Sequence, residues 1–123
     1  MVKLCNQIAI AVNVLAAAEA LTFARKAGLD LATVIEAVGA GSAGSWAIKV
    51  LGPRMASRDF AAGFMVKLQL KDLRLVMQEA SELGVPLAGA AVAQQLFTAI
   101  QAEGGGDDGT QALVRAVEKL AGL

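Results

Sequence analysis

Apolar residues recur along the chain at helical spacing, and no segment shows sustained alternation of apolar and polar positions. The clearest stripe consists of five residues separated by three or four positions, as on one face of an α-helix: Val66, Leu70, Leu73, Met77 and Ala80. The abundant alanine and leucine favour helix as well. The pattern predicts an all-α domain of six or seven helices with a long, buried N-terminal helix.

Glycine, proline and capping residues predict where these helices begin and end. The first helix should run from about Val2 to Ala27, where Gly28 closes it in a left-handed cap. It is apolar nearly all round, which predicts a central position. Gly52-Pro53 should break a helix or begin a new turn, and Ser57–Gly63 should be a loop. The other predicted helices are Asp30–Val38, Ser45–Leu51, Met65–Leu83, Pro86–Ala102 and Thr110–Leu120. Asp30 and Thr110 should cap the helices that they begin, and Gly84 should end the helix Met65–Leu83.

Composition narrows the possible functions. At 123 residues, of which 56% are hydrophobic, the chain has the size of one domain and is too apolar for intrinsic disorder. It contains no histidine and a single cysteine, Cys5, which excludes the usual zinc sites and histidine-activated nucleophiles. Basic and acidic residues balance at 11 each, so a general nucleic-acid-binding charge is absent. A lone cysteine fits a reducing, cytoplasmic compartment.

The apolar N-terminal run predicts neither a membrane span nor a signal peptide. Asn6, Gln7 and Asn13 interrupt it, and its helical character continues past the alanines that would precede a cleavage site. We therefore expect a soluble protein that does not bind a membrane.

Residues Gly39 to Gly44 match the dinucleotide-binding pattern G-x-G-x-x-G literally. That pattern binds a pyrophosphate only where it follows a buried strand and begins a helix. The residues before it include Glu36, whereas a central parallel strand would be apolar on both faces. The segment is interpreted as a loop between helices.

Two polar features are candidates for binding chemistry. Lys3, Asn6 and Gln7 are three or four positions apart, so their side chains either converge on one site or belong to an exposed, frayed helix start. Lys67, Lys71 and Arg74 form a cationic edge beside the apolar stripe of their helix, and a solvated face is favoured there over an anion site.

Several short runs together resemble the C-terminal domain of the β-hydroxyacid dehydrogenases, in matching order and spacing over essentially the whole chain. The resemblance is greatest to 2-hydroxy-3-oxopropionate (tartronate semialdehyde) reductases and 3-hydroxyisobutyrate dehydrogenases, and it implies a fold like the C-terminal domain of 6-phosphogluconate dehydrogenase. The runs are Lys3-Leu4-Cys5-Asn6-Gln7, Glu19-Ala20-Leu21, Ala27-Gly28, Ala43-Gly44-Ser45, Gly63-Phe64 and Lys71-Asp72-Leu73.

The resemblance implies roles for individual residues. Lys3 would be the catalytic lysine that exchanges a proton with the substrate oxygen as hydride moves. Substrate would be bound by Asn6, Gln7, Phe64 and Asp72. The cofactor would be contacted by Lys71, and no residue would bind a metal. Glutamine at position 7 favours the tartronate semialdehyde group, and lysine at position 3 argues against imine reductases.

The resemblance also implies a domain organisation. Residues 1–123 would be one C-terminal substrate-binding and dimerisation domain, and the N-terminal Rossmann domain that completes the cleft is absent from the chain. We expect NAD or NADP in the full-length enzyme, none bound to this chain, and no turnover by the isolated chain. Its expected partners are a small hydroxy acid, the missing domain and a second copy of itself. The alternative is a stand-alone helical interaction module without enzymatic activity.

Overall fold

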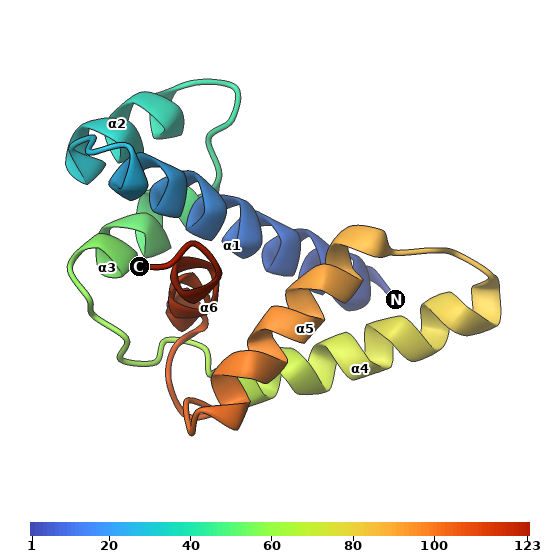
Figure 1. The fold of residues 1–123 in the computed structure, drawn as a ribbon. Coiled ribbons are helices and arrows are strands. Elements are labelled where there is room, and N and C mark those ends of the chain that lie inside the picture. Colours follow the sequence, from blue (N-terminus) through green and yellow to red (C-terminus); the bar gives the residue numbers. More distant parts are fainter.

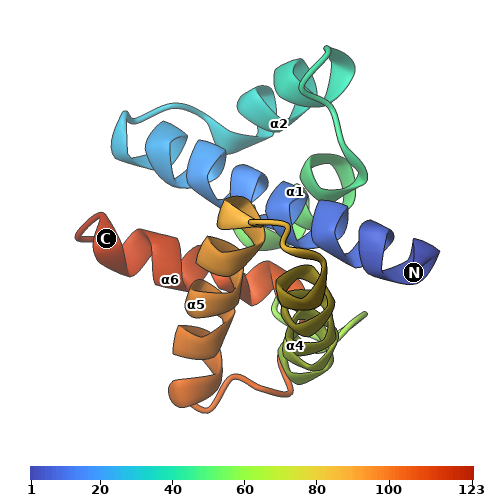
Figure 2. The same cartoon turned by 90° about the vertical axis from the view of Figure 1, so that its right-hand side faces the viewer.

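The computed structural model describes all 123 residues as six α-helices and two short helical turns, with no β-strand. Helix α1 lies in the middle, with α2 on one side of it and α4, α5 and α6 on the other (Figures 1 and 2). The elements in chain order are α1 (Val2–Lys26), α2 (Leu31–Ala40), the π-helical turn η1 (Ala47–Leu51), α3 (Gly52–Ala56), α4 (Val66–Leu83), α5 (Ala88–Ala102), the 3-10 turn η2 (Thr110–Ala112) and α6 (Leu113–Leu120).

Helix α1 is the central element of the core. Small side chains such as Ala11 and Ala18 are fully buried and allow the surrounding helices to approach closely. The helix is not buried all round, however, since Phe23 is 75% exposed. By length and composition alone α1 could cross a membrane, yet half of its most apolar stretch is buried inside the fold, as expected of a core helix.

Most predicted helix ends are confirmed. Gly28 and Gly84 have φ angles of +76° and +70° and end α1 and α4, because glycine adopts the left-handed region without steric cost. Asp30 caps α2, its carboxylate accepting a hydrogen bond from the Thr33 amide at 3.1 Å. The apolar stripe of α4 faces the core, with Val66, Leu70, Leu73 and Ala80 buried and Met77 partly buried.

Four predicted boundaries are wrong. Helix α2 ends at Ala40 rather than at Val38. Helix α5 begins at Ala88 rather than at Pro86. Thr110 does not cap a helix with its side chain, because it is the first residue of η2. The third predicted helix is instead the π-helical turn η1, which continues directly into α3 at Gly52. In each case the backbone groups at the helix end have hydrogen-bond partners other than those that the local capping pattern predicts.

Two loops that are distant in sequence are joined by backbone hydrogen bonds. At the start of α4 the Val66 and Lys67 amides donate to the carbonyls of Asp108 and Gly106, each at 2.9 Å. The Thr110 amide donates to the Phe64 carbonyl at 3.0 Å. The first amides of a helix have no partner within the helix, so the second loop serves as their cap. This pairing fixes the segment around Phe64 against η2.

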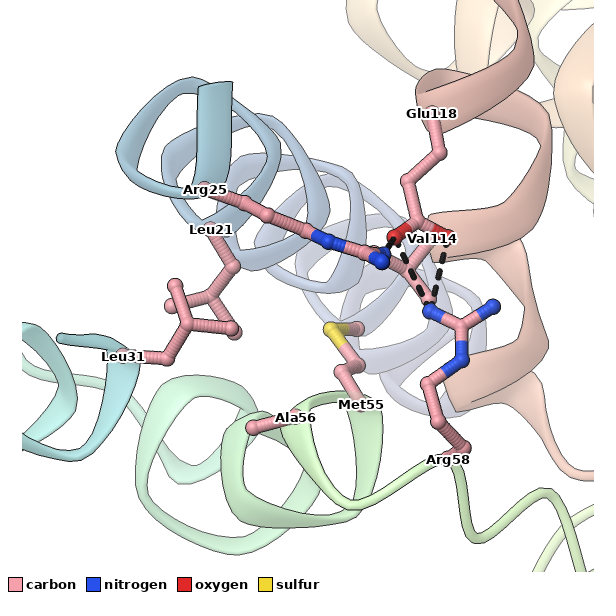
Figure 3. A pocket seen from close by; sticks show the side chains of 8 residues that line it. All are labelled: Leu21, Arg25, Leu31, Met55, Ala56, Arg58, Val114 and Glu118. Carbon is pink, nitrogen blue, oxygen red and sulfur yellow. Dashed lines mark hydrogen bonds and ion pairs between the residues drawn. The ribbon is translucent and has the colours of Figure 1, made fainter. Parts of the chain in front are cut away.

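A buried carboxylate connects α6 to two other parts of the fold. The side chain of Glu118 is 7% exposed and forms ion pairs with Arg25 of α1 and with Arg58 of the loop after α3. Figure 3 shows both guanidinium groups directed at this carboxylate across a hollow of about 210 Å³. Arg58 has a φ of +62°, an unusual conformation for a residue other than glycine, and its ion pair supports that conformation.

Candidate functional site

A second hollow brings together residues from six segments of the chain. Its volume is about 330 Å³, near the lower end of the range for small-molecule sites. Five of its twelve lining residues are hydrophobic, and six carry polar side chains: four neutral amides, a hydroxyl and a single guanidinium. The lining residues are Asn6, Gln7 and Ile10 of α1, Trp46, Val50 and Leu51 around η1, Arg54 of α3, Gly63 and Phe64 of the following loop, Gln69 of α4, and Thr110 and Gln111 of η2.

Gln7 is held in place by a buried relay of hydrogen bonds. Its Nε2 donates to Oδ2 of Asp72 at 2.7 Å, and its Oε1 accepts from Nδ2 of Asn6 at 3.2 Å. Gln7 and Asp72 are both buried, whereas Asn6 is exposed. These bonds fix the Gln7 amide at the wall of the hollow, and the side-chain oxygen of Asn6 accepts no hydrogen bond within the chain.

The structure brings together only part of the predicted site. Asn6, Gln7 and Phe64 line the hollow, but Asp72 does not, because its carboxylate is engaged by Gln7 behind the wall. Lys3 lies one helical turn before Gln7 on the same stripe of α1 and is exposed. Lys3 is not one of the residues that line the hollow, and its side chain is exposed to solvent.

The cationic edge of α4 separates into residues with different environments. Lys67 forms an ion pair with Asp107 at 2.7 Å. Lys71 and Arg74 are exposed and form no ion pair. All three side chains are exposed, as the solvated-face interpretation predicts, and Lys71 and Arg74 have no acidic partner that would compete with an anionic group.

Arg54 and Gln111 form a wall that sequence reasoning missed. Arg54 donates through Nε to Oδ2 of Asp59 at 3.2 Å and through Nη2 to the Ala61 carbonyl at 2.6 Å. Gln111 Nε2 donates to the carbonyls of Asp59 and Ala61, each at 2.9 Å. The Arg54 guanidinium and the Ala61 amide hold the pKa of Asp59 below its usual value. No local sequence signal marks this wall, since its members come from three separate segments.

Gln69 lines the hollow but was not predicted as a site residue, although its position in the sequence could have indicated it. It is polar, yet it stands three positions after Val66 and four before Leu73, a spacing that places it beside the apolar stripe of α4. Its side chain is completely buried and lines the hollow. Trp46, 56% exposed, is a further missed lining residue.

The glycine-rich segment Gly39–Gly44 at the end of α2 forms a tight turn in which backbone atoms approach one another closely. A Cβ atom on Gly44 would lie 2.5 Å from the Gly39 carbonyl oxygen. The Gly44 amide donates to the Gly41 carbonyl at 3.0 Å, so the loop closes on itself. Gly44 is therefore required by this tight turn. Residues 41–44 lie in the connection between helices, as interpreted, whereas Gly39 and Ala40 belong to the end of α2.

Comparison with known proteins places the chain in a family. Residues 1–117 match the family model described as NAD-binding of NADP-dependent 3-hydroxyisobutyrate dehydrogenase. An uncharacterised oxidoreductase of Synechocystis sp. is 51% identical over 94% of this chain and 39% of its own length. The 2-hydroxy-3-oxopropionate reductase of Escherichia coli is 43% identical over 97% of this chain and 41% of its own length.

A solved structure agrees with these sequence matches. The crystal structure of 3-hydroxyisobutyrate dehydrogenase from Salmonella typhimurium superimposes with a TM-score of 0.88 and 30% identity, covering 93% of this chain and 40% of that one. The chain belongs to the 3-hydroxyisobutyrate dehydrogenase family. It spans about two-fifths of the length of the relatives it matches.

The family match corrects the assignment of the fold. The sequence resemblance predicted a substrate-binding and dimerisation domain like the C-terminal domain of 6-phosphogluconate dehydrogenase. The matching family model is instead described as NAD-binding, so the region that these helices form is the one that the family model describes as cofactor-binding. That assignment rested on the resemblance of short motifs, and the chain lacks the strand-turn-helix pattern by which a cofactor-binding region is usually recognised.

Proposed function

We propose that this chain supplies the catalytic lysine and part of the substrate pocket of an NAD(P)-dependent dehydrogenase that interconverts a small β-hydroxy acid and its oxo acid or semialdehyde. The observation that carries the proposal is the amide-lined hollow beside the N-terminal part of α1, where Asn6 and Gln7 form one wall. The family of the chain and the names of its relatives support the same chemistry.

The residues of the hollow suit a small polar acid. Amide groups and the Thr110 hydroxyl offer both donors and acceptors, and Arg54 adds one positive charge that Asp59 partly balances. Such a lining would bind the carboxylate and hydroxyl of a substrate without requiring a metal. Asp72 would act as a positioning residue that keeps the Gln7 amide in orientation, and Phe64 would cover the apolar part of the substrate.

Lys3 would act as the general base in oxidation and as the general acid in reduction. In the oxidation direction its neutral amine accepts the proton of the substrate hydroxyl while the carbon-bound hydrogen departs as hydride, which leaves a carbonyl group. In reduction the Lys3 ammonium returns that proton to the carbonyl oxygen. General acid–base catalysis of this kind contributes about 10²- to 10⁴-fold to a rate. Lys3 is exposed one helical turn before Gln7, which lines the hollow, so it would be free to reach a substrate held between two domains.

Bound NAD or NADP would accept or deliver the hydride. The residues here fit one side of such a cofactor, because Lys71 is exposed and has no acidic partner that would compete for its charge. The hollow itself matches a small acid better than a dinucleotide. We therefore propose that a second, Rossmann-type domain outside residues 1–123 binds most of the cofactor and completes the cleft, and that the isolated chain does not turn over substrate.

We also propose that the chain self-associates and acts in the cytoplasm. Fourteen large apolar side chains are at least 40% exposed, among them Phe23 at 75% and Leu83 at 63%. Burial of such surface favours association. Light scattering at micromolar concentration should give a mass above that of one chain, and a monomeric profile would contradict this part of the proposal.

The test compares the isolated chain with the complete polypeptide encoded in the same reading frame. Reduction of NAD and NADP is followed with glycerate and with 3-hydroxyisobutyrate as substrates. We expect turnover by the complete protein and none by residues 1–123 alone. Turnover by the isolated chain would contradict the need for a second domain. A reading frame that holds only these residues, with no turnover, would favour the alternative of a helical interaction module.

A further inference from the structure

Gln69 carries unsatisfied polar atoms at the wall of the hollow. Its side chain has no exposed surface, and neither Nε2 nor Oε1 has a hydrogen-bond partner. Buried polar groups are nearly always hydrogen-bonded, because their desolvation is unfavourable without a partner. The only other buried side-chain atom without a partner is Oγ1 of Thr22, which does not line the hollow.

The neighbouring glutamines are already engaged elsewhere. Gln7 donates to Asp72 and accepts from Asn6, and Gln111 donates to two backbone carbonyls of the adjacent loop. No side chain of the hollow supplies the partner that Gln69 lacks, which leaves its amide free for a ligand that enters the hollow. Trp46 and Phe64, 56% and 41% exposed, line the same hollow.

The chemistry of the amide restricts what this partner is. A primary amide presents a donor and an acceptor side by side, and a hydroxyl group is the small group that pairs with both. A carboxylate only accepts, and a methyl group does neither. The acids of this family differ at carbon 2 in this respect: glycerate carries a hydroxyl there, and 3-hydroxyisobutyrate carries a methyl group.

We propose that Gln69 is a specificity-determining residue that hydrogen-bonds the carbon-2 hydroxyl of a three-carbon dihydroxy acid and disfavours the 2-methyl analogue. The inference rests on the proposed function and names the substrate class of that same hollow. A methyl group would leave the buried amide unpaired, and sites built to bind a hydroxyl reject analogues that lack it strongly.

The experiment replaces Gln69 by leucine and by methionine in the complete enzyme. Exposed Gln78, on the same helix, is replaced by leucine as the matched control. We expect the ratio of kcat/KM for glycerate to that for 3-hydroxyisobutyrate to fall at least about tenfold in both Gln69 variants and to stay unchanged in Gln78→Leu. Without ligand, Gln69→Leu and Gln69→Met should have a higher Tm than wild type, because an apolar group replaces an unpaired amide.

The outcomes separate this inference from the proposed function. If wild type turns over neither acid, the proposed function fails. If wild type is active but the Gln69 variants keep the wild-type ratio, only the assignment of Gln69 fails. A lowered Tm together with equal losses for both acids would show that the amide has a purely structural partner, such as a buried water molecule, and would likewise overturn the assignment.

Discussion

Gln7 and Asp72 are 65 positions apart in the sequence, yet Gln7 Nε2 donates a buried hydrogen bond of 2.7 Å to Oδ2 of Asp72. This contact joins α1 to α4 at the wall of the candidate site. It also separates the roles of two residues that the family resemblance had grouped together. Gln7 lines the hollow, and Asp72 lies behind it and fixes the orientation of the amide.

Replacement of Asp72 should therefore act on stability through Gln7. In Asp72→Ala the buried Gln7 amide loses its acceptor, and the free energy of unfolding should fall by about 1–3 kcal/mol. Asp72→Asn keeps an acceptor oxygen in the same place and should lose clearly less. Urea denaturation of the three proteins measures the difference. Equal losses in both variants would mean that the charge of Asp72, rather than its acceptor oxygen, is what the fold requires.

Glu118 should be the most costly of the paired carboxylates to neutralise. Its side chain is 7% exposed and pairs with both Arg25 and Arg58, but these arginines are about half-exposed, so water still screens part of the interaction. Glu118→Gln should lower the free energy of unfolding by about 1–2 kcal/mol. In the control Asp107→Asn, whose carboxylate is 77% exposed, the change should stay within about 0.5 kcal/mol. Similar losses in the two variants would contradict a special role for the buried carboxylate.

Two glycines of the same loop should respond very differently to alanine. A Cβ atom on Gly44 would lie 2.5 Å from a backbone oxygen, whereas the nearest atom to a Cβ on Gly41 is 3.8 Å away. Gly44→Ala should cost about 1–3 kcal/mol of stability, because the backbone must shift. Gly41→Ala should change stability by less than about 1 kcal/mol. Thermal unfolding compares them, and a tolerant Gly44 would show that the turn is not as tight as described.

Asp59 should make folding sensitive to acid. Arg54 and the Ala61 amide lower the pKa of Asp59 in the folded protein, so the carboxylate stabilises the fold above its unfolded pKa. That contribution is lost as the pH falls through the folded pKa, below about pH 4. The Tm difference between wild type and Asp59→Asn should be largest at neutral pH and shrink in acid. A difference independent of pH would rule out titration of Asp59 as its source.

The sequence predicted the parts of this structure that depend on local patterns. The ends of α1 and α4 follow from Gly28 and Gly84, because a left-handed cap needs little beyond the glycine itself. The apolar stripe of α4 predicted which side faces the core. Thr110 was misjudged, because the adjoining loop supplies the backbone partners that a capping side chain would otherwise provide.

The candidate site was only partly predictable for a related reason. Asn6 and Gln7 share one helix, so their convergence could be expected from spacing alone. Arg54 and Gln111 reach the hollow from segments that are far apart in the sequence, and only tertiary packing brings them together. Gln69 was visible as a polar residue beside an apolar stripe, but its missing partners become apparent only when all of its surroundings are known.

The most direct test of the central claim is the kcat of Lys3→Ala in the complete enzyme. The control is Lys119→Ala, which removes a 78% exposed lysine at the end of α6, outside the hollow. We predict that Lys3→Ala lowers kcat by about 10²- to 10⁴-fold with a much smaller change in KM, because the proton transfer is lost while the pocket remains. The control should retain wild-type kcat. A Lys3→Ala enzyme with wild-type kcat would contradict the assignment of this chain as the source of the catalytic lysine.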